Sequence, residues 1–414
     1  MVGVVTACRA CGGRLSVVMA DLGLQPASNA FLESRAGFAH EKRYPLRARV
    51  CDVCKLVQLD YDVAREELFG NYVYFSSYSD DWLAHAKAYC EMARRRFALS
   101  SSSLVVELAS NDGYLLKNFL SVGIPVLGID PSDTVAAAAE KIGVPTLVEF
   151  FGRTVSQDLA ARGSRADLII ANNVLAHVPD LNDFVAGIAV LLKPSGTVTI
   201  EFPHLLELME HVEFDTIYHE HYSYFSLFAL EQVFVRHGLR IYDVERLPTH
   251  GGSLRIFAAP AARADLNDSA LLRAVRTQEN AAGLADLGAY LQFSKRVAEC
   301  RDSLLAFLAD AKAAGKRVAA YGAAAKGNTL LNFCGVTPDD IVFVADRNPH
   351  KQNKFLPGTH IPVVSPEHLM GSKPDYVLIL PWNLRDEIRQ QLDGIKAWGG
   401  RFVTPVPLAR ILSR

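Results

Sequence analysis

The sequence predicts an α/β protein built from three units, a small zinc module followed by two Rossmann-like sheets. Two C-x-x-C pairs near the start indicate the zinc module, expected at residues 1–68. Short buried-strand patterns alternate with helical patterns between residues 104 and 202, and again between 317 and 404. Such alternation is typical of doubly wound parallel sheets, here expected within residues 69–248 and 249–414.

Length and composition agree with this division. The chain has 414 residues, which is enough for two or three domains. The formal net charge of −2 predicts no large field of one sign, so neither a nucleic-acid nor an anionic-membrane partner is expected. The first residues lack the pattern of an export signal, and no window approaches the roughly 18 apolar residues of a membrane span. We therefore expect a cytoplasmic protein.

The zinc module rests on four of the seven cysteines. Each C-x-x-C turn lets two thiolates face one ion, and two such turns supply a closed tetrahedral site that would hold the fold without taking part in chemistry. A redox pair or unrelated buried cysteines are the alternatives, but a redox pair needs only one such turn at a helix N-terminus. The expected ligands are Cys8, Cys11, Cys51 and Cys54.

The segment 69–78 joins this module to the central unit and is rich in Tyr, Phe and Ser. It is either an aromatic seam between domains or a loop that faces a substrate. On the second interpretation Tyr74, Ser76 and Ser77 are candidate site residues.

The central unit begins with a helix over 83–98. Glu107 ends a buried strand over 104–108, a turn follows at 109–113, and a second strand over 126–130 ends in Asp130. The carboxyl ends of parallel strands meet at one edge of the sheet, so we expect the site there. The remaining expected strands are 146–148, 167–173 and 196–202, and the expected helices are 114–120, 134–142 and 181–192.

This spacing resembles class I S-adenosylmethionine (SAM) methyltransferases, in which an acid precedes a glycine-rich turn and a second acid binds the ribose. Glu107 and Asp130 match these positions. Of the usual glycines, the turn keeps only Gly113. This loss argues more strongly against a dinucleotide than against SAM, because a pyrophosphate needs close approach to bare backbone and SAM has no phosphate. The resemblance implies cofactor contacts from Glu107, Ser110, Asn111, Asp112, Gly113, Asp130, Phe151 and Asn172.

The segment 215–222 gathers two imidazoles, a carboxylate and a phenol into Tyr218-His219-Glu220-His221. It is either a metal-binding site or a set of general acid–base groups. His219 and His221 share a face only on a strand, and a third metal ligand is not evident. His177 follows the fourth strand, where it is either near the reacting methyl group or merely packed.

The third unit contains helical patterns over 265–313, a strand over 317–321 and a helix that opens near Lys326. The lysine precedes the second glycine, so this is not a Walker P-loop, yet a helix N-terminus with a lysine favours a phosphate. One alternative is a structural lid whose lysines are solvated. Another is a nicotinamide site, because Gly322 and Asp346 have the spacing of a Rossmann site. Two adjacent glycines at 251–252 allow close approach to a ligand.

Taken together, the chain resembles the zinc-containing SAM-dependent C-methyltransferases of nucleotide-activated 4-keto-6-deoxysugars. The resemblance covers essentially the whole chain and is carried by the cysteine pairs and by segments 107–113, 171–179, 214–225, 249–255, 321–326 and 346–362. It implies C-methylation, at C3 of a dTDP- or GDP-linked 4-keto-6-deoxyhexose, in deoxysugar biosynthesis. Methylation at C5, or O- or N-methylation of another acceptor, remains the alternative, and a non-catalytic scaffold is the rival from another class.

The resemblance also implies roles for individual residues. A base removes a proton beside the ketone, and either Tyr218 or His221 is that base, while Glu220 would orient His221. The implied catalytic set is Tyr218, His221, Glu220, His177 and Tyr74. The implied substrate contacts are Ser76, Ser77, His250, Gly251, Lys326 and Lys351, beside SAM and a structural Zn²⁺.

Overall fold

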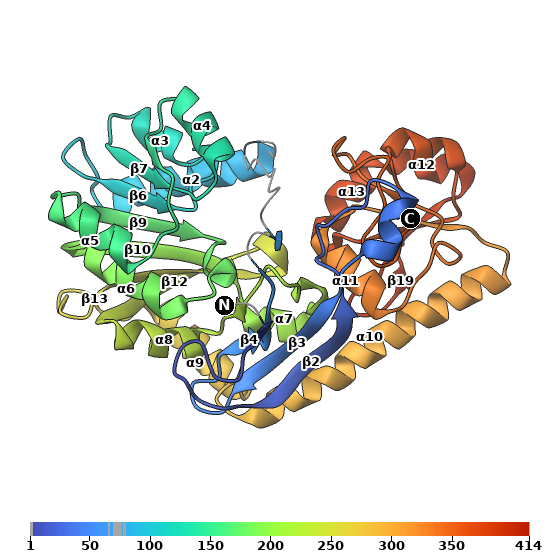
Figure 1. Ribbon diagram of the computed structural model, residues 1–414, viewed down its shortest axis with the longest axis horizontal. Coiled ribbons are helices and arrows are strands. Elements are labelled where there is room, and N and C mark those ends of the chain that lie inside the picture. The colour runs from blue at the N-terminus through green and yellow to red at the C-terminus, as the bar shows by residue number, and fades with distance from the viewer. Residues whose placement is uncertain (1–2, 65–66, 69–76, 78–79, 414) are drawn as a thin grey trace.

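The computed structural model describes residues 3–64, 67–68, 77 and 80–413 (Figure 1). The central unit, coloured cyan to yellow, lies on one side and the orange-to-red third unit on the other. The blue strands β2 and β3 and the long helix α10 run beneath both and connect them (Figure 1). Tyr74 and Ser76, two of the candidate site residues, lie outside the described residues.

The N-terminal module is a four-stranded sheet in the order β11-β4-β3-β2, with all neighbours antiparallel. Three of its strands come from the first 60 residues, but β11 (Ser223–Tyr224) comes from the segment directly after the Tyr218–His221 run. A small ladder and a 3-10 helix complete the module. The bounds are β2 (Leu15–Gln25), β3 (Tyr44–Cys51), β4 (Val57–Leu59), β1 (Gly3–Val4), β5 (Tyr61–Asp62) and η1 (Arg35–His40).

The central sheet has seven strands in the order β12-β13-β10-β9-β6-β7-β8. The five strands from β10 to β8 are parallel, whereas β12 and β13 form an antiparallel hairpin at one edge. The carboxyl ends of the parallel strands therefore share one edge, as predicted. The bounds are β6 (Val105–Leu108), β7 (Val126–Ile129), β8 (Thr146–Leu147), β9 (Ala166–Asn172), β10 (Leu192–Pro203), β12 (Leu239–Leu247) and β13 (Ser253–Pro260).

The hairpin extends the central sheet beyond the expected limit at residue 248. β13 pairs with β10 from Val198 to Pro203 and with β12 on its other side. Both of its neighbours belong to the central sheet, so the chain leaves this sheet only after Pro260.

The helices of the central unit cover both faces of the sheet (Figure 1). Side-chain caps define several of their starts, because Asp180, Ser226 and Ser269 each accept from a backbone N–H three residues ahead. The bounds are α2 (Asp80–Arg96), α3 (Leu116–Leu120), α4 (Asp133–Lys141), α5 (Arg153–Ala161), η3 (Leu175–His177), α6 (Leu181–Leu191), α7 (Leu205–His211), η4 (Phe214–Thr216), α8 (Leu227–Arg236), η5 (Thr249–Gly251) and α9 (Ala270–Ala281).

The third unit is a six-stranded sheet in the order β16-β15-β14-β17-β18-β19, parallel except for β19. The chain order reverses between β14 and β17, which is where ligands bind in open α/β sheets. The bounds are β14 (Val318–Tyr321), α11 (Ala325–Phe333), β15 (Val344–Ala345), β16 (Val363–Val364), α12 (Pro366–Ser372), β17 (Tyr376–Ile379), η6 (Trp382–Leu384), α13 (Arg385–Gln391), η7 (Asp393–Trp398), β18 (Arg401–Thr404) and β19 (Arg410–Ile411).

One hydrophobic core joins all three units. Helix α10 (Leu287–Ala313) buries a stripe at helical spacing from Tyr290 to Ala311. This stripe belongs to the same cluster as Leu46 of β3, Phe214 of η4 and Leu330 of α11. The segment that leads into the Tyr218–His221 run is thus embedded where the three units meet.

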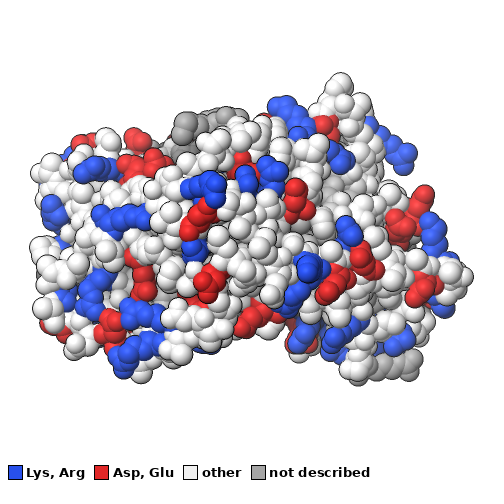
Figure 2. Space-filling model, turned by 90° about the horizontal axis from the view of Figure 1, so that it is seen from below, with Lys and Arg blue, Asp and Glu red and all other residues white. Residues whose placement is uncertain are grey.

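The surface carries charges of both signs. On the face shown in Figure 2, Lys and Arg alternate with Asp and Glu over both lobes, in line with the net charge of −2. Within the described part of the chain, the helices are all too short or too polar to cross a membrane.

Candidate active site

The four cysteines of the N-terminal module converge as predicted. Their sulfur atoms all lie within 4.8 Å of one another, and three of the residues are buried. Gly13 leaves the space that this cluster needs, because a Cβ there would lie 3.1 Å from the Sγ atoms of Cys11 and Cys51. Four converging thiols fit a tetrahedral Zn²⁺ with closed coordination, which Cys8, Cys11, Cys51 and Cys54 would hold. In the described residues this is the only cluster with metal-ligand spacing.

The turn after β6 takes its shape without the usual glycines. Ala109 and Asn111 adopt φ values of 54° and 50°, and Gly113 has a φ of 75°. Asparagine tolerates the left-handed region better than most residues, whereas alanine is strained there. The backbone thus forms a tight turn at the expected place, and two side-chain-bearing residues occupy conformations that favour glycine.

Two carboxyl groups stand at the ends of neighbouring strands. The carboxylate of Asp130 accepts from the backbone N–H groups of Asn111 and Ser132, each at 3.0 Å. Burial raises the pKa of Asp130. Burial also raises the pKa of Glu107 well above its usual range, and the charges of Asp130 and Asp112 add to this effect. The turn is therefore a concentrated acidic site.

Several buried polar atoms around this turn have no hydrogen-bond partner among the described residues. Buried polar groups are normally paired, so such a group points to a missing polar ligand. The atoms are Glu107 Oε2, Ser110 Oγ, Asp112 Oδ1 and Asn172 Oδ1. Hydroxyl and amino groups, as in the ribose and amino-acid portions of SAM, fit this set, and the structure therefore brings most of the predicted cofactor residues together.

Gly128 of β7 makes room for Ser110. A Cβ at Gly128 would lie 2.4 Å from the Ser110 hydroxyl oxygen. Phe151 packs edge-on against Phe184, with 5.2 Å between ring centroids. On the opposite side, the backbone N–H of Ser77 donates to Asp112 at 3.2 Å, so the described residue of the aromatic segment contacts the cofactor turn rather than standing apart from it.

The Tyr218–His221 run is anchored to the N-terminal module. Strand β11 pairs with β4, and the carbonyl of Tyr222 accepts from the N–H of Leu59 at 3.0 Å. The ring of His219 contacts the carbonyl oxygen of Pro45 at 3.2 Å through Nε2. On its other side the N–H of Tyr222 donates to the carbonyl of Ala176 at 2.7 Å, which holds the run against the end of β9.

His221 and Tyr218 form a hydrogen-bonded pair. Nδ1 of His221 lies 3.0 Å from the carbonyl oxygen of Thr216, and Nε2 lies 2.9 Å from the hydroxyl of Tyr218. A carbonyl only accepts, so Nδ1 carries the ring proton and the Tyr218 hydroxyl donates to Nε2. Burial lowers the pKa of His221 well below its usual range, with a further contribution from His177, which keeps the ring neutral.

His177 completes this group. Its ring meets that of His221 edge-on, with 4.8 Å between centroids. Burial lowers the pKa of His177 to about 4, against an opposing hydrogen bond with the backbone of Glu220. Three of the predicted catalytic side chains therefore lie together as neutral donors and acceptors at neutral pH.

Glu220 faces elsewhere than expected. Its carboxyl oxygen Oε1 accepts from the side-chain amide of Asn29 at 2.6 Å. Both ring nitrogens of His221 are engaged by Thr216 and Tyr218, so these groups orient the imidazole, not Glu220. Burial raises the pKa of Glu220 to about 7, and Asn29 opposes the rise. Asn29 comes from the N-terminal module, and no sequence motif pointed to it.

Lys326 lies between the central and third units. Its Nζ donates to the carbonyl of His250 at 3.2 Å and stands 4.7 Å from the ring centroid of Trp382. Burial lowers its pKa, opposed by the charges of Asp215 and Glu213. The predicted phosphate-binding lysine thus lies in the electrostatic field of two buried acids to which sequence patterns gave no role.

These two acids are buried opposite the end of β17. Asp215 accepts from Nε1 of Trp382 at 2.7 Å, and burial raises its pKa to about 6. Burial likewise raises the pKa of Glu213 to about 8 against the opposing charge of Lys326. Gly251 packs against this cluster, because a Cβ there would lie 2.3 Å from Glu213 Oε1 and 2.6 Å from the Trp382 ring.

His250 and Lys351 occupy different places. Burial lowers the pKa of His250 to about 4, and its ring lies 6.0 Å from that of Trp82. Lys351 donates to the carbonyl of Ala323 at 2.8 Å, in the loop that follows β14. His250 therefore lies toward the central unit, whereas Lys351 follows β15 in the third unit and reaches the loop after β14.

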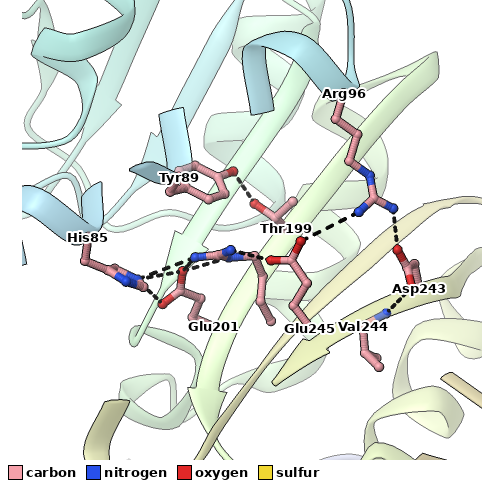
Figure 3. A network of polar contacts seen from close by, with 9 residues as sticks. His85, Tyr89, Arg96, Thr199, Glu201, Asp243, Val244 and Glu245 are labelled. Atoms are coloured by element: carbon pink, nitrogen blue, oxygen red, sulfur yellow. Dashed lines mark hydrogen bonds and ion pairs between the residues drawn. The ribbon is translucent and has the colours of Figure 1, made fainter. Parts of the chain in front are cut away.

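A buried ionic network joins α2 to strands β10 and β13 of the central sheet, and the sequence did not predict it (Figure 3). Glu201 lies near the end of β10 and is fully buried, with Nε2 of His85 at 3.0 Å and Nε of Arg255 at 2.8 Å. Burial alone would raise the pKa of Glu201, but His85 and Arg255 hold it below its usual value. The network fastens α2, which carries Trp82, to β10 and β13.

Family models match the chain in three consecutive segments. Residues 8–69 match a model described as "Putative zinc binding domain", and residues 82–244 match a "Methyltransferase domain". Residues 248–407 match a "C-methyltransferase C-terminal domain". The three models follow one another in the order of the three units.

Individual proteins are also similar to this chain, over its whole length or over part of it. C-methyltransferase NovU from Streptomyces niveus is 36% identical over 406 residues, which are 98% of this chain and 96% of that protein. Ubiquinone biosynthesis O-methyltransferase from Rhodopseudomonas palustris (strain TIE-1) is 29% identical over 117 residues, 27% of this chain and 46% of that protein. Among solved structures, the alignment with the PH0226 protein from Pyrococcus horikoshii OT3 covers 48% of this chain and 100% of that one at 15% identity, with a TM-score of 0.37.

Proposed function

The chain belongs to the C-methyltransferase family, and on that premise we propose that it methylates C3 of a nucleotide-linked 4-keto-6-deoxyhexose. It is a SAM-dependent methyltransferase with a four-cysteine zinc module. When bound, SAM supplies a methyl group on a positively charged sulfur. A carbon acceptor becomes a nucleophile only after it loses a proton, so the proposal requires a base and a group that stabilises the resulting enolate.

The Tyr218–His221 pair is the observation that carries this proposal. The neutral His221 ring holds its Nε2 lone pair toward the Tyr218 hydroxyl at 2.9 Å. We assign proton removal to the pair as a unit. Either Nε2 takes the proton from C3, or Tyr218 takes it after passing its own proton to Nε2. In both cases the C–H electron pair moves into the enolate, whose charge rests on the C4 oxygen.

His177 is suited to stabilise that oxygen. It lies beside His221, and its low pKa keeps it neutral, so an N–H of its ring can donate a hydrogen bond without releasing its proton. A neutral imidazole is an effective donor to an enolate in other enzymes. We assign to Tyr74 and to Ser76 the substrate-side positions that the family resemblance gives them.

The nucleotide portion requires a second binding region. We propose that the diphosphate lies along the loop after β14, at the point where the strand order of the third unit reverses. Lys351 donates to the carbonyl of Ala323 in this loop, and Lys326, which follows the loop at the start of α11, donates to the carbonyl of His250. We assign His250 and the neighbouring Gly251, which packs beside Trp382, to the same substrate region. Ser77 faces the same substrate from the cofactor side.

A mass and exchange assay tests the function. The protein is incubated with SAM and either dTDP- or GDP-4-keto-6-deoxyglucose, and a gain of one methyl group is expected. Without SAM in deuterium oxide, the C3 proton should be replaced by deuterium. Exchange at C5 instead would assign C5-methylation, and methyl transfer without any C–H exchange would favour an O- or N-methyltransferase. Absence of product across a panel of 4-ketosugars would overturn the proposal.

A further inference from the structure

Asn29 belongs to the N-terminal module, and its side chain contacts Glu220 of the predicted catalytic set. It lies in the connection between β2 and η1, four residues beyond the end of β2 at Gln25. Its amide Nδ2 donates to Oε1 of Glu220 at 2.6 Å. The donor is exposed whereas the acceptor is 6% exposed, so the contact closes one side of a buried carboxyl group.

The backbone around Asn29 is held from two directions. The neighbouring hydroxyl of Ser28 lies 3.3 Å from that of Thr329 in α11. Leu32 exchanges backbone hydrogen bonds with Phe355 of the third unit, at 3.0 Å and 2.8 Å. The segment is therefore fixed to the third unit, and its amide is presented to Glu220 by a rigid support.

Glu220 occupies a central place in the catalytic run. Tyr218 and His221 stand on either side of it in the chain, and its backbone hydrogen-bonds with the ring of His177. His219, in the same run, faces Pro45 of β3. Around Glu220 the titratable neighbours are thus His219, His221 and Tyr218 on its own loop, His177 of η3, and Tyr44 beside His219. Burial and Asn29 are the two causes of its pKa shift.

We propose that Asn29 is a positioning residue of the methyl-transfer site, fixing the orientation and the ionisation of the Glu220 carboxyl group. The proposal rests on the function assigned above to the Tyr218–His221 run. It gives the N-terminal module a direct part in the active site in addition to binding zinc. An amide donor stabilises the ionised carboxylate, so its removal leaves the carboxyl group protonated up to a higher pH.

The test is a double-mutant cycle over pH. Asn29→Leu removes the donor but keeps a side chain that branches at Cγ, and Glu220→Gln removes the titrating group. Methyl transfer and C3 exchange are measured from pH 5 to 9 in the wild type, both single variants and the double variant. The part of each profile that depends on Glu220 is read as the difference between a protein and its Glu220→Gln counterpart. In the Asn29→Leu background this difference should appear about one pH unit higher than in the wild type, because a hydrogen bond to a charged group contributes about 1.5–3 kcal/mol and one pKa unit corresponds to about 1.4 kcal/mol.

Ser28→Ala is the matched control. It disturbs the same segment through its contact with Thr329 but leaves the Glu220 contact intact. It should keep the wild-type pH profile. An unshifted profile in Asn29→Leu would overturn the proposal, and so would an equal shift in Ser28→Ala.

A denaturation cycle separates this inference from the substrate assignment. Unfolding free energies of the same four proteins are measured over the same pH range, without any ligand. Asn29→Leu should lose stability relative to the wild type as pH rises above about 7, where the Glu220 carboxyl group ionises in the wild type but stays protonated in the variant, and this pH dependence should vanish in the Glu220→Gln background. If no sugar is methylated, the function proposed above fails, and this cycle alone decides whether Asn29 controls Glu220. A cycle without coupling would refute it.

Discussion

The hydroxyl of Tyr218 donates to Nε2 of His221 at 2.9 Å, in a ring whose other nitrogen is fixed by a backbone carbonyl. The tautomer is therefore set by the fold and not by the substrate. An imidazole locked in this way offers one lone pair, and that lone pair is directed at a phenol.

If this pair removes the proton, each member should be required. Tyr218→Phe and His221→Asn are expected to lower C3 deuterium exchange and methyl transfer by about 10²- to 10⁴-fold, the usual contribution of general-base catalysis. SAM affinity, measured by calorimetry, should stay within a few-fold of wild type, since neither side chain belongs to the cofactor turn. Exchange at the wild-type rate in either variant would contradict the assignment to the pair.

The Glu213 carboxyl group makes the fold sensitive to pH. Its folded pKa of about 8 exceeds the value of an unfolded glutamate, so between about pH 4.5 and 8 the folded state binds a proton that the unfolded state has released. Stability should consequently fall as pH rises through this window. Glu213→Gln should remove this fall, gaining on the order of a few kcal/mol over the wild type by pH 8.

Chemical denaturation at several pH values measures this difference. Asp215 remains in the variant as a partner for Lys326, so the lysine is not left alone. Glu210→Gln, at an exposed position nearby, is the control and should follow the wild type. A constant difference between Glu213→Gln and wild type across the range would refute the prediction.

Loss of zinc should alter the structure of the Tyr218–His221 run. Cys54→Ser removes one of four ligands, and the strand β4 that follows it supports β11. The amide of Leu59, which donates to Tyr222, should exchange faster with solvent in the variant and in chelator-treated protein. Methyl transfer should fall with it, and added zinc should restore both in the chelated wild type. Full protection of Leu59 in zinc-free protein would count against this link.

A single methyl group at Gly128 should weaken cofactor binding. The new Cβ would lie 2.4 Å from Ser110 Oγ, and overpacking of this kind costs about 1–3 kcal/mol. We expect Gly128→Ala to raise the Kd for SAM by about tenfold, and Ser110→Ala in the same chain to relieve part of the clash. Gly288→Ala, which meets no atom within 4 Å, should bind SAM as the wild type does. Equal SAM affinities in Gly128→Ala and Gly288→Ala would contradict the prediction, because they would show that the turn accommodates the added methyl group without weakening SAM binding.

Local patterns predicted much of this molecule. The cysteine spacing predicted a cluster that the structure forms, and the strand pattern predicted a tight turn that brings Glu107 and Asp130 to one edge of the sheet, which the structure also forms. These features succeed because each depends on a few neighbouring residues and on the common edge of a parallel sheet. Methyltransferase activity and C-methylation follow from the family to which the chain belongs.

Contacts between distant segments were beyond such patterns. Nothing in the two-residue strand Ser223–Tyr224 signals that it joins a sheet formed by the first 60 residues. The lysine at 326 was predicted to favour a phosphate, but its buried partners Asp215 and Glu213 belong to another unit. Glu220 was expected to orient His221, whereas an exposed asparagine far earlier in the chain holds its carboxyl group.

Strand β11 also constrains the order in which the chain can acquire its structure. Tyr224 pairs with Val57, so the N-terminal sheet lacks its last strand until the ribosome has passed residue 224. The four cysteines all precede that point and can capture a metal ion earlier. A zinc-loaded but unfinished sheet with an open edge would therefore wait for the central unit, and pairing across such a long separation is intrinsically slow. Synthesis of a truncated chain ending before residue 223 would leave that edge permanently exposed.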